Sequence, residues 1–251
     1  DQLSKLSNSK KKIYTNITFV DIAGLVKGAS KGEGLGNKFL SHIREVDAII
    51  HLVRCFESDQ ITHVNSKINP VEDLETIKTE IILSDIDVIQ KKLDKGKKKL
   101  LDEKEIKILE EKLSQLNEGN EVTSNDQAEI KFLSSLGLLS IKPKIIVCNV
   151  DEESLAEGNI FTKSIKEAHP NEKIVTICAD IEDQIMGLDN NERETFMKEI
   201  GLSKTGLNQL IKEGYELLNL DTFFTSGPEE SRAWTVKKNT LAPKAASVIH
   251  T

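Results

Sequence analysis

The stretch that decides the fold is residues 17–40, which read ITFVDIAGLVKGASKGEGLGNKFL. It opens with an apolar run, Ile17 to Val20, which predicts a buried parallel strand. Asp21 follows at the carboxyl end of that strand, where open α/β sheets bind their ligands. An acidic residue in this place suits a Mg²⁺ ion held through water, and the glycine three residues on, Gly24, lets the backbone approach a phosphate.

Four more glycines follow within a short distance: Gly28, Gly32, Gly34 and Gly36. Such a segment can change its backbone conformation easily, as a nucleotide-dependent switch must. A plain alternative is that Asp21 caps a helix after a glycine turn, because an acid followed by a glycine is a common pairing. The long glycine-rich continuation favours the switch.

This continuation resembles the second switch of the Obg-related P-loop nucleoside triphosphatases, and most closely their YchF / Obg-like ATPase branch. The resemblance extends through Arg44-Glu45-Val46-Asp47-Ala48-Ile49 and Val53-Arg54-Cys55-Phe56, and on to residue 251. It implies a P-loop sheet with helices on both faces, an inserted helical hairpin and the start of a TGS domain, a small β-grasp-like module.

The phosphate-binding loop itself, G-x-x-x-x-G-K-[ST], occurs nowhere in the chain. The resemblance implies that such a loop precedes Asp1, and that the TGS domain continues beyond Thr251. We therefore expect the 251 residues alone to be inactive as an enzyme.

Composition limits the possible functions. The net charge of −7 argues against a general coat for nucleic acids, so we expect no DNA partner. No apolar run approaches the roughly 18 residues that span a membrane, and no signal peptide is visible, so a cytoplasmic protein is expected. The three cysteines, Cys55, Cys148 and Cys178, lie in or beside apolar runs and are expected to be reduced core residues.

The pattern of apolar residues predicts four segments. Residues 1–69 are expected to form the first part of the nucleotide-binding domain, and residues 141–219 its second part. Between them, residues 70–140 carry helical spacing, with a glycine break at Gly96, and predict an inserted coiled-coil hairpin. Residues 220–251 contain two short strand patterns around Gly227-Pro228 and are expected to be the partial TGS domain.

Three buried strands are expected after the first one, at residues 47–55, 144–148 and 173–178. Helices are predicted at 38–46, 162–168, 190–200 and 205–218, and Ser124 with Gln127 predicts a capping box for a helix at 125–136.

Asn149-Val150-Asp151-Glu152 directly follows the predicted strand 144–148. In GTPases the equivalent loop is N-K-x-D, whose aspartate pairs with the N1–H and amino group of guanine. Here Glu152 replaces the aspartate and Val150 the lysine, and the resemblance implies an N-x-x-E loop that prefers adenine. We expect Asn149, Val150 and Glu152 to bind the base. Without the other motifs, the same residues would read as a polar turn.

Leu25 occupies the place where many GTPases carry a glutamine that orients the attacking water. A leucine cannot do so, and the resemblance assigns that role to a loop histidine, matched here by His63. An ordinary surface histidine is the alternative.

A run of lysines surrounds Gly96: Lys91, Lys92, Lys95, Lys97, Lys98 and Lys99. Most such runs are solvated helix ends. The resemblance implies ribosome association, which favours contact with rRNA phosphates.

Together these observations predict a P-loop enzyme that hydrolyses ATP in preference to GTP, with Mg²⁺ as cofactor, as a ribosome-associated switch. Two alternatives remain at this point. One is an Obg-type GTPase, and the other is an RNA- or ribosome-binding adaptor with a vestigial nucleotide site.

Overall fold

The computed structural model describes residues 1–22, 35–58, 68–96 and 101–249. These residues form two compact units. One contains residues 1–20 and 207–251, and the other contains residues 21–206. This division differs from the expected one, because the first 20 residues group with the C-terminal part of the chain.

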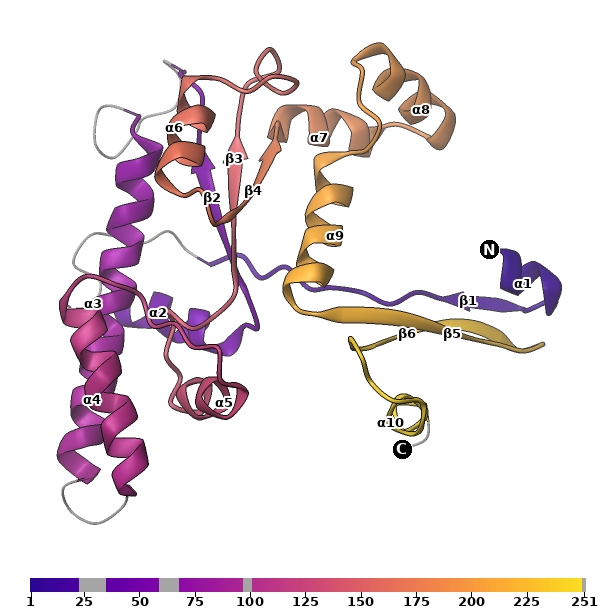
Figure 1. Cartoon of the computed structure of the whole chain (residues 1–251). Coiled ribbons are helices and arrows are strands. Elements are labelled where there is room, and N and C mark those ends of the chain that lie inside the picture. Colours follow the sequence, from indigo (N-terminus) through magenta and orange to yellow (C-terminus); the bar gives the residue numbers. More distant parts are fainter. Residues whose placement is uncertain (23–34, 59–67, 97–100, 250–251) are drawn as a thin grey trace. The chain divides into compact units, whose positions relative to one another are not determined.

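A parallel three-stranded sheet lies at the centre of the 21–206 unit, in the order β2 (Ile49–Arg54), β3 (Lys144–Asn149) and β4 (Lys173–Ile177). β3 is the central strand (Figure 1). Four consecutive residues of it, 145–148, are buried. Such uninterrupted burial is typical of a parallel strand covered on both faces. The predicted α/β class with a parallel sheet is thus confirmed.

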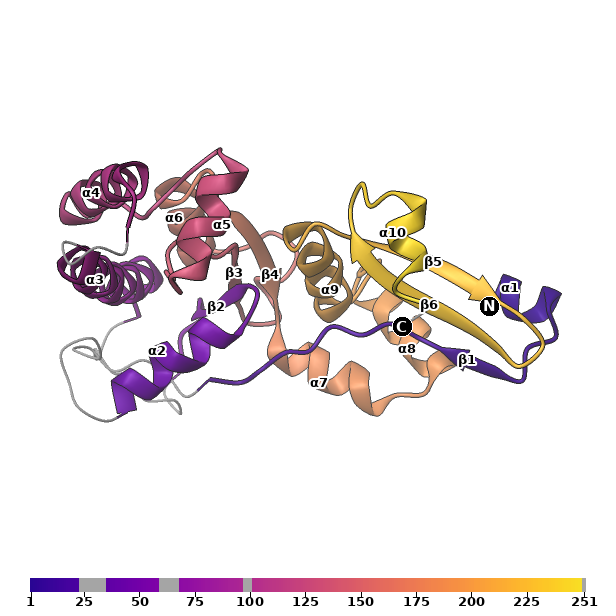
Figure 2. The same cartoon turned by 90° about the horizontal axis from the view of Figure 1, so that it is seen from below.

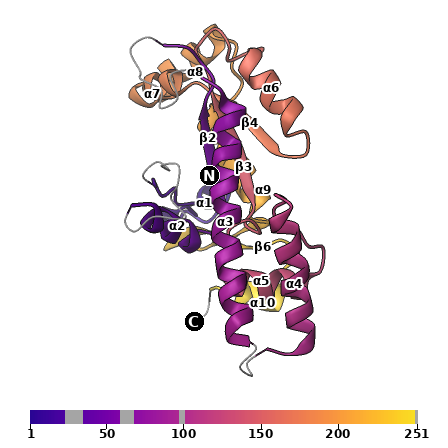
Figure 3. The same ribbon diagram turned by 90° about the vertical axis from the view of Figure 1, so that its left-hand side faces the viewer.

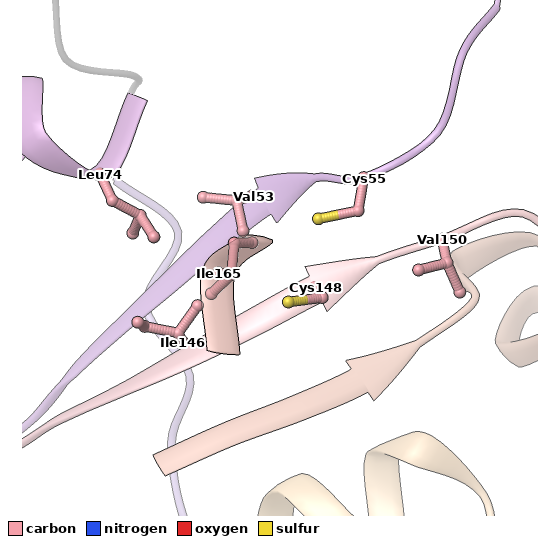
Figure 4. Close-up of a cluster of buried hydrophobic side chains, with 7 residues drawn as sticks. All are labelled: Val53, Cys55, Leu74, Ile146, Cys148, Val150 and Ile165. Atoms are coloured by element: carbon pink, nitrogen blue, oxygen red, sulfur yellow. The ribbon is translucent and has the colours of Figure 1, made fainter. Parts of the chain in front are cut away.

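One face of this sheet packs against α3 (Pro70–Gly96) and α6 (Ile160–Ala168). Figure 4 shows the cluster, which contains Val53, Cys55, Leu74, Ile146, Cys148, Val150 and Ile165. Alternate residues of β2 and β3 supply it, because side chains on one face of a strand repeat every two residues. The cluster fixes the spacing of β2 and β3 as they approach their carboxyl ends.

Helices occupy the segment for which an inserted hairpin is predicted. α3 and α4 (Glu103–Asn117) run side by side, with α5 (Gln127–Ser135) next to them (Figure 3). Their shared core contains Ile89, Leu109, Leu116 and Leu133, all almost fully buried. The capping residue of α5 is Asp126, not Ser124, and its Oδ1 accepts the N–H of Ala128 at 2.8 Å. The predicted capping box is therefore wrong, because Ser124 instead accepts the N–H of Asp126.

A buried joint fixes the base of the insertion. Asp85 of α3 is fully buried, and its carboxylate accepts the backbone N–H groups of Leu139 (2.8 Å) and Ser140 (2.9 Å). Ser140 also donates its hydroxyl to Asp85. Beside it, Arg44 at the end of α2 (Leu35–Glu45) donates to the hydroxyl of Ser84 at 2.8 Å. Burial raises the pKa of Asp85, while these hydrogen bonds favour the charged form.

Two more helices complete this unit, α7 (Ala179–Gly187) and α8 (Asn190–Glu199). The helix predicted at 190–200 is confirmed as α8, whereas no helix was predicted at α7, which begins directly after the strand predicted at 173–178. α7 packs through Ile181 and Ile185, which are buried with Cys178.

The other unit contains an antiparallel hairpin of β5 (Leu220–Ser226) and β6 (Glu230–Lys237), with β1 (Lys11–Ile13) parallel to β6. α1 (Gln2–Leu6), α9 (Gly206–Leu217) and α10 (Ala242–Ala246) accompany it (Figure 2). The two strand patterns predicted around Gly227 are thus confirmed.

The predicted strand at Ile17–Val20 is wrong within the described residues. Phe19 and Val20 are 44% and 58% exposed, and no strand is formed there. The preceding residue Thr15 instead bonds to Tyr215 of α9 and Thr235 of β6. A short apolar run does not distinguish a buried strand from an extended segment that packs on one side, and here exposure alternates along residues 13–18.

In the part of the chain that the structure describes, no helix combines the length and apolarity needed to cross a membrane.

Candidate nucleotide-base site

The candidate site lies at the carboxyl edge of the β2–β3–β4 sheet. The register aligns Arg54, Asn149 and Ile177, so the three strands end at the same level. Parallel strands direct their carboxyl ends to one edge, where the following loops can converge on a ligand. The loop after β3 therefore stands between the loops after β2 and β4.

Asn149 joins all three strands at this edge. Its backbone carbonyl accepts the N–H of Cys55, which follows β2, at 2.8 Å. Its side-chain Oδ1 accepts the N–H of Ala179, the first residue of α7 after β4, at 3.0 Å. Asn149 thus holds the start of the loop between the ends of β2 and β4, while its contact with a base stays a prediction.

Val150 points into the protein core. It is 2% exposed and belongs to the cluster with Cys148 and Ile165 (Figure 4). Its backbone N–H donates to the carbonyl of Ile177 at 2.9 Å. A base contact through the Val150 side chain does not fit this burial, so Val150 serves to hold the loop against β4.

Glu152 is exposed, and its carboxylate Oε1 accepts a hydrogen bond from Nε2 of Gln184 at 3.1 Å. Gln184 lies on α7, whose first residue is bonded to Asn149. The loop after β3 is thus attached to α7 at two places. No sequence signal identified Gln184, because it lies 32 residues from Glu152.

Asn159 supports the other side of the loop. Its side chain caps α6 by accepting the N–H groups of Phe161 and Thr162. The same side chain donates from Nδ2 to the carbonyl of Cys55 at 2.7 Å and to the hydroxyl of Ser154 at 3.2 Å. One asparagine therefore links the end of β2, the loop after β3 and the start of α6. Sequence reasoning missed this residue, although an asparagine before a helical pattern is a typical cap.

The cysteines are free and buried, as predicted. Contact with Cys148, together with burial, raises the pKa of the Cys55 thiol. Burial also raises the pKa of Cys178. Neutral thiols in these positions act as small apolar core residues.

The remaining predicted site residues are separate from this loop or lie outside the described residues. Asp21 is exposed at the start of the 21–206 unit. Gly24, Leu25 and His63 fall outside the described residues. The chain that leads toward His63 is held by Arg54, whose guanidinium donates to the carbonyls of Phe56 (3.0 Å) and Ser58 (3.1 Å).

Within the described residues, no group of three or more His, Cys, Asp or Glu side chains is placed to hold a metal ion. Asp21 is among the exposed carboxylates of the described residues, and its role in assisting Mg²⁺ stays a prediction.

Comparison with known proteins agrees with this architecture. A family model described as "50S ribosome-binding GTPase" matches residues 4–92. The YchF-GTPase_C model, described as "Protein of unknown function (DUF933)", matches residues 220–251. The two matches fall on the N-terminal and C-terminal parts of the chain.

Among individual proteins, the ribosome-binding ATPase YchF of Escherichia coli O157:H7 is 44% identical over 263 residues, which is 100% of this chain and 71% of that protein. The protein of the same name from Bacillus subtilis is also 44% identical, over 99% of this chain and 71% of its own length.

A solved structure is similar as well. It is that of the Schizosaccharomyces pombe YchF GTPase, which superposes with a TM-score of 0.85 and 33% identity over 99% of this chain and 70% of its own. An identity of 44% over 71% of the length of the Escherichia coli protein is enough to assign the family. The chain belongs to the YchF family of P-loop nucleoside triphosphatases.

Proposed function

We propose that the protein hydrolyses ATP in preference to GTP and works as a nucleotide-dependent switch on the ribosome. The observation that carries the proposal is the Asn149–Glu152 loop, held at the carboxyl edge of the sheet with an exposed carboxylate at its end. Nucleotide hydrolysis is the activity named for its YchF relatives. The preference for adenine is our inference from Glu152.

The chemistry of the bases supports this preference. Guanine offers both an N1–H and an amino group to a correctly placed carboxylate, whereas adenine offers one amino group and no N1–H. A glutamate reaches one methylene further than the aspartate of the GTPase loop, so its oxygens occupy a different position. A site that does not match the donors of guanine leaves polar groups unpaired, and this discriminates strongly against it.

Asp21 would assist Mg²⁺ through a bound water, and the ion would neutralise phosphate charge during hydrolysis. Gly24 would bring the backbone close to the γ-phosphate, and His63 would orient the attacking water in place of Leu25. These three roles extend the proposal to residues other than those of the Asn149–Glu152 loop.

The ribosome is the proposed partner, through the helical insertion. Two of the relatives named above are named as ribosome-binding proteins. A ribosomal partner would also imply a cytoplasmic location. Lys91 and Lys92 lie on the last turns of α3 toward the tip, and Lys91 is exposed and paired with Asp87 at 2.6 Å. Lysines in such a position would contact rRNA phosphates.

The test is Glu152→Asp in the full-length protein, measured by calorimetric titration with ATP and with GTP in the presence of Mg²⁺. The shortened carboxylate should shift the ratio of the two Kd values toward GTP by about tenfold, the effect of one good paired contact. Val150 is left unchanged, because a lysine there would bury an ammonium group in the cluster around Cys148. Glu153→Asp, the same change at the next, exposed residue, is the control. An unchanged ratio would show that Glu152 does not read the base.

A further inference from the structure

The bond between Gln184 and Glu152 connects two exposed side chains from separate elements. Nε2 of Gln184 donates to Oε1 of Glu152 at 3.1 Å. Glu152 lies in the loop after β3, and Gln184 lies on the second turn of α7. Of the contacts described at this edge of the sheet, it is the one that reaches the carboxylate proposed to read the base.

Buried residues of α7 fix the position of Gln184. Its neighbour Ile185 is 3% exposed, and Ile181, one turn earlier, is 4% exposed, and both pack with Cys178. At the start of α7, the N–H of Ala179 is held by Asn149. Residue 184 is therefore carried by a helix anchored both to the core and to the base loop.

A glutamate on a surface loop has several accessible side-chain rotamers, and each rotamer places the carboxylate differently. A hydrogen bond to one oxygen selects among them and leaves the second oxygen, Oε2, free to accept from a ligand. An amide is suited to this task because it donates without neutralising the carboxylate, whereas a lysine would compete with the ligand as a charged partner.

We propose that Gln184 is a positioning residue that determines base specificity, because it holds Glu152 so that its free oxygen meets the exocyclic amino group of adenine. This rests on the proposed reading of the base by Glu152. Binding of ATP then benefits from a carboxylate that is already in place, so less side-chain entropy is lost on binding.

The experiment is a double-mutant cycle in the full-length protein, with calorimetric Kd values for ATP and GTP. Gln184→Leu removes both the donor and the acceptor, and Gln184→Glu keeps the shape but removes the N–H. Both should weaken ATP binding by about 2- to 10-fold, the range of one hydrogen bond, and leave GTP binding unchanged. In a Glu152→Ala background, Gln184→Leu should have no further effect.

Gln209→Leu is the matched control, an exposed glutamine on α9 whose loss should change neither Kd. The inference is overturned if Gln184→Leu leaves the ATP/GTP ratio unchanged, or if it weakens ATP binding equally with and without Glu152. With either result, the proposed function still holds if the Glu152→Ala single variant changes the ratio of the Kd values for ATP and GTP. If Glu152→Ala also leaves the ratio unchanged, base reading by Glu152 fails, and the role of Gln184 fails with it.

Discussion

His51 should make the 21–206 unit lose stability in mild acid. It lies on β2, is only 9% exposed, and its Nε2 has no hydrogen-bond partner within the described residues. Burial, followed by the charges of Lys144 and His169, lowers its pKa from 6.5 to about 4. Lys144 is itself paired with Glu121 and Glu172, so its charge is held in place near His51.

The sign follows from proton linkage. Between pH 6.5 and about 4 the unfolded chain binds a proton at residue 51 and the folded protein does not, so the free energy of unfolding falls as the pH falls. This difference between the unfolded and folded pKa of His51 lowers the free energy of unfolding by about 2 kcal/mol at pH 5. The loss reaches about 3 kcal/mol once the pH is below both pKa values. Above pH 7 the contribution of His51 is fully retained.

The assay is urea unfolding of the wild type and His51→Gln at pH 7.5 and pH 5.0. Far-UV circular dichroism is the suitable signal, because the single tryptophan, Trp234, belongs to the other unit. The wild type should lose about 2 kcal/mol more than the variant between the two pH values. Subtracting the variant also removes the opposing contribution of Asp85, whose pKa is raised.

His42→Gln is the control, since His42 is exposed on α2 and should behave like the wild type. Equal losses in the wild type and His51→Gln would refute the reasoning, because His51 would then titrate alike in the folded and unfolded chain.

Three further predictions concern other parts of the chain. His63→Ala should lower kcat for ATP hydrolysis by roughly 10- to 100-fold, while the Kd for ATP stays within about twofold of the wild-type value. A wild-type rate, both with and without ribosomes, would exclude a role of His63 in orienting water. Asp85→Ala should reduce the free energy of unfolding by about 3 kcal/mol, because the buried N–H of Leu139 and the partly buried N–H of Ser140 lose their acceptor. A loss below about 1 kcal/mol in urea unfolding would contradict this. Neutralising the lysines next to Gly96 in the sequence should weaken ribosome binding and reduce the log–log salt slope by about 0.7–0.9 per lost phosphate contact, whereas an unchanged slope would make them solvated residues. The set is Lys95, Lys97, Lys98 and Lys99, of which the last three fall outside the described residues.

The parallel sheet and the helical insertion could be predicted because their patterns are local. β3 is a continuous apolar run, and the helices of the insertion repeat their apolar residues every three or four positions. The strand prediction for Ile17–Val20 failed for the opposite reason, since the burial of this segment depends on which element packs beside it. Its four residues carry no information about that partner.

The candidate site was predicted only in part. The Asn149 loop was visible because it follows a strand with a recognisable spacing. The inward direction of Val150 could also have been inferred, since it continues the alternation of Ile146 and Cys148 on one face of β3. Gln184 could not, because only the folded chain brings it to Glu152.

The joint at Asp85 has a consequence for how the protein can vary in length. Its bonds to Leu139 and Ser140 close an excursion of more than 50 residues at its base, where the chain enters and leaves the sheet. The cost of closing a chain segment grows only slowly with its length, by about 0.6 kcal/mol for each doubling. Insertions at the tip of the hairpin, between α3 and α4, should therefore leave the sheet and its loops undisturbed. A tag inserted between α3 and α4 should therefore leave the thermal stability of the sheet unchanged.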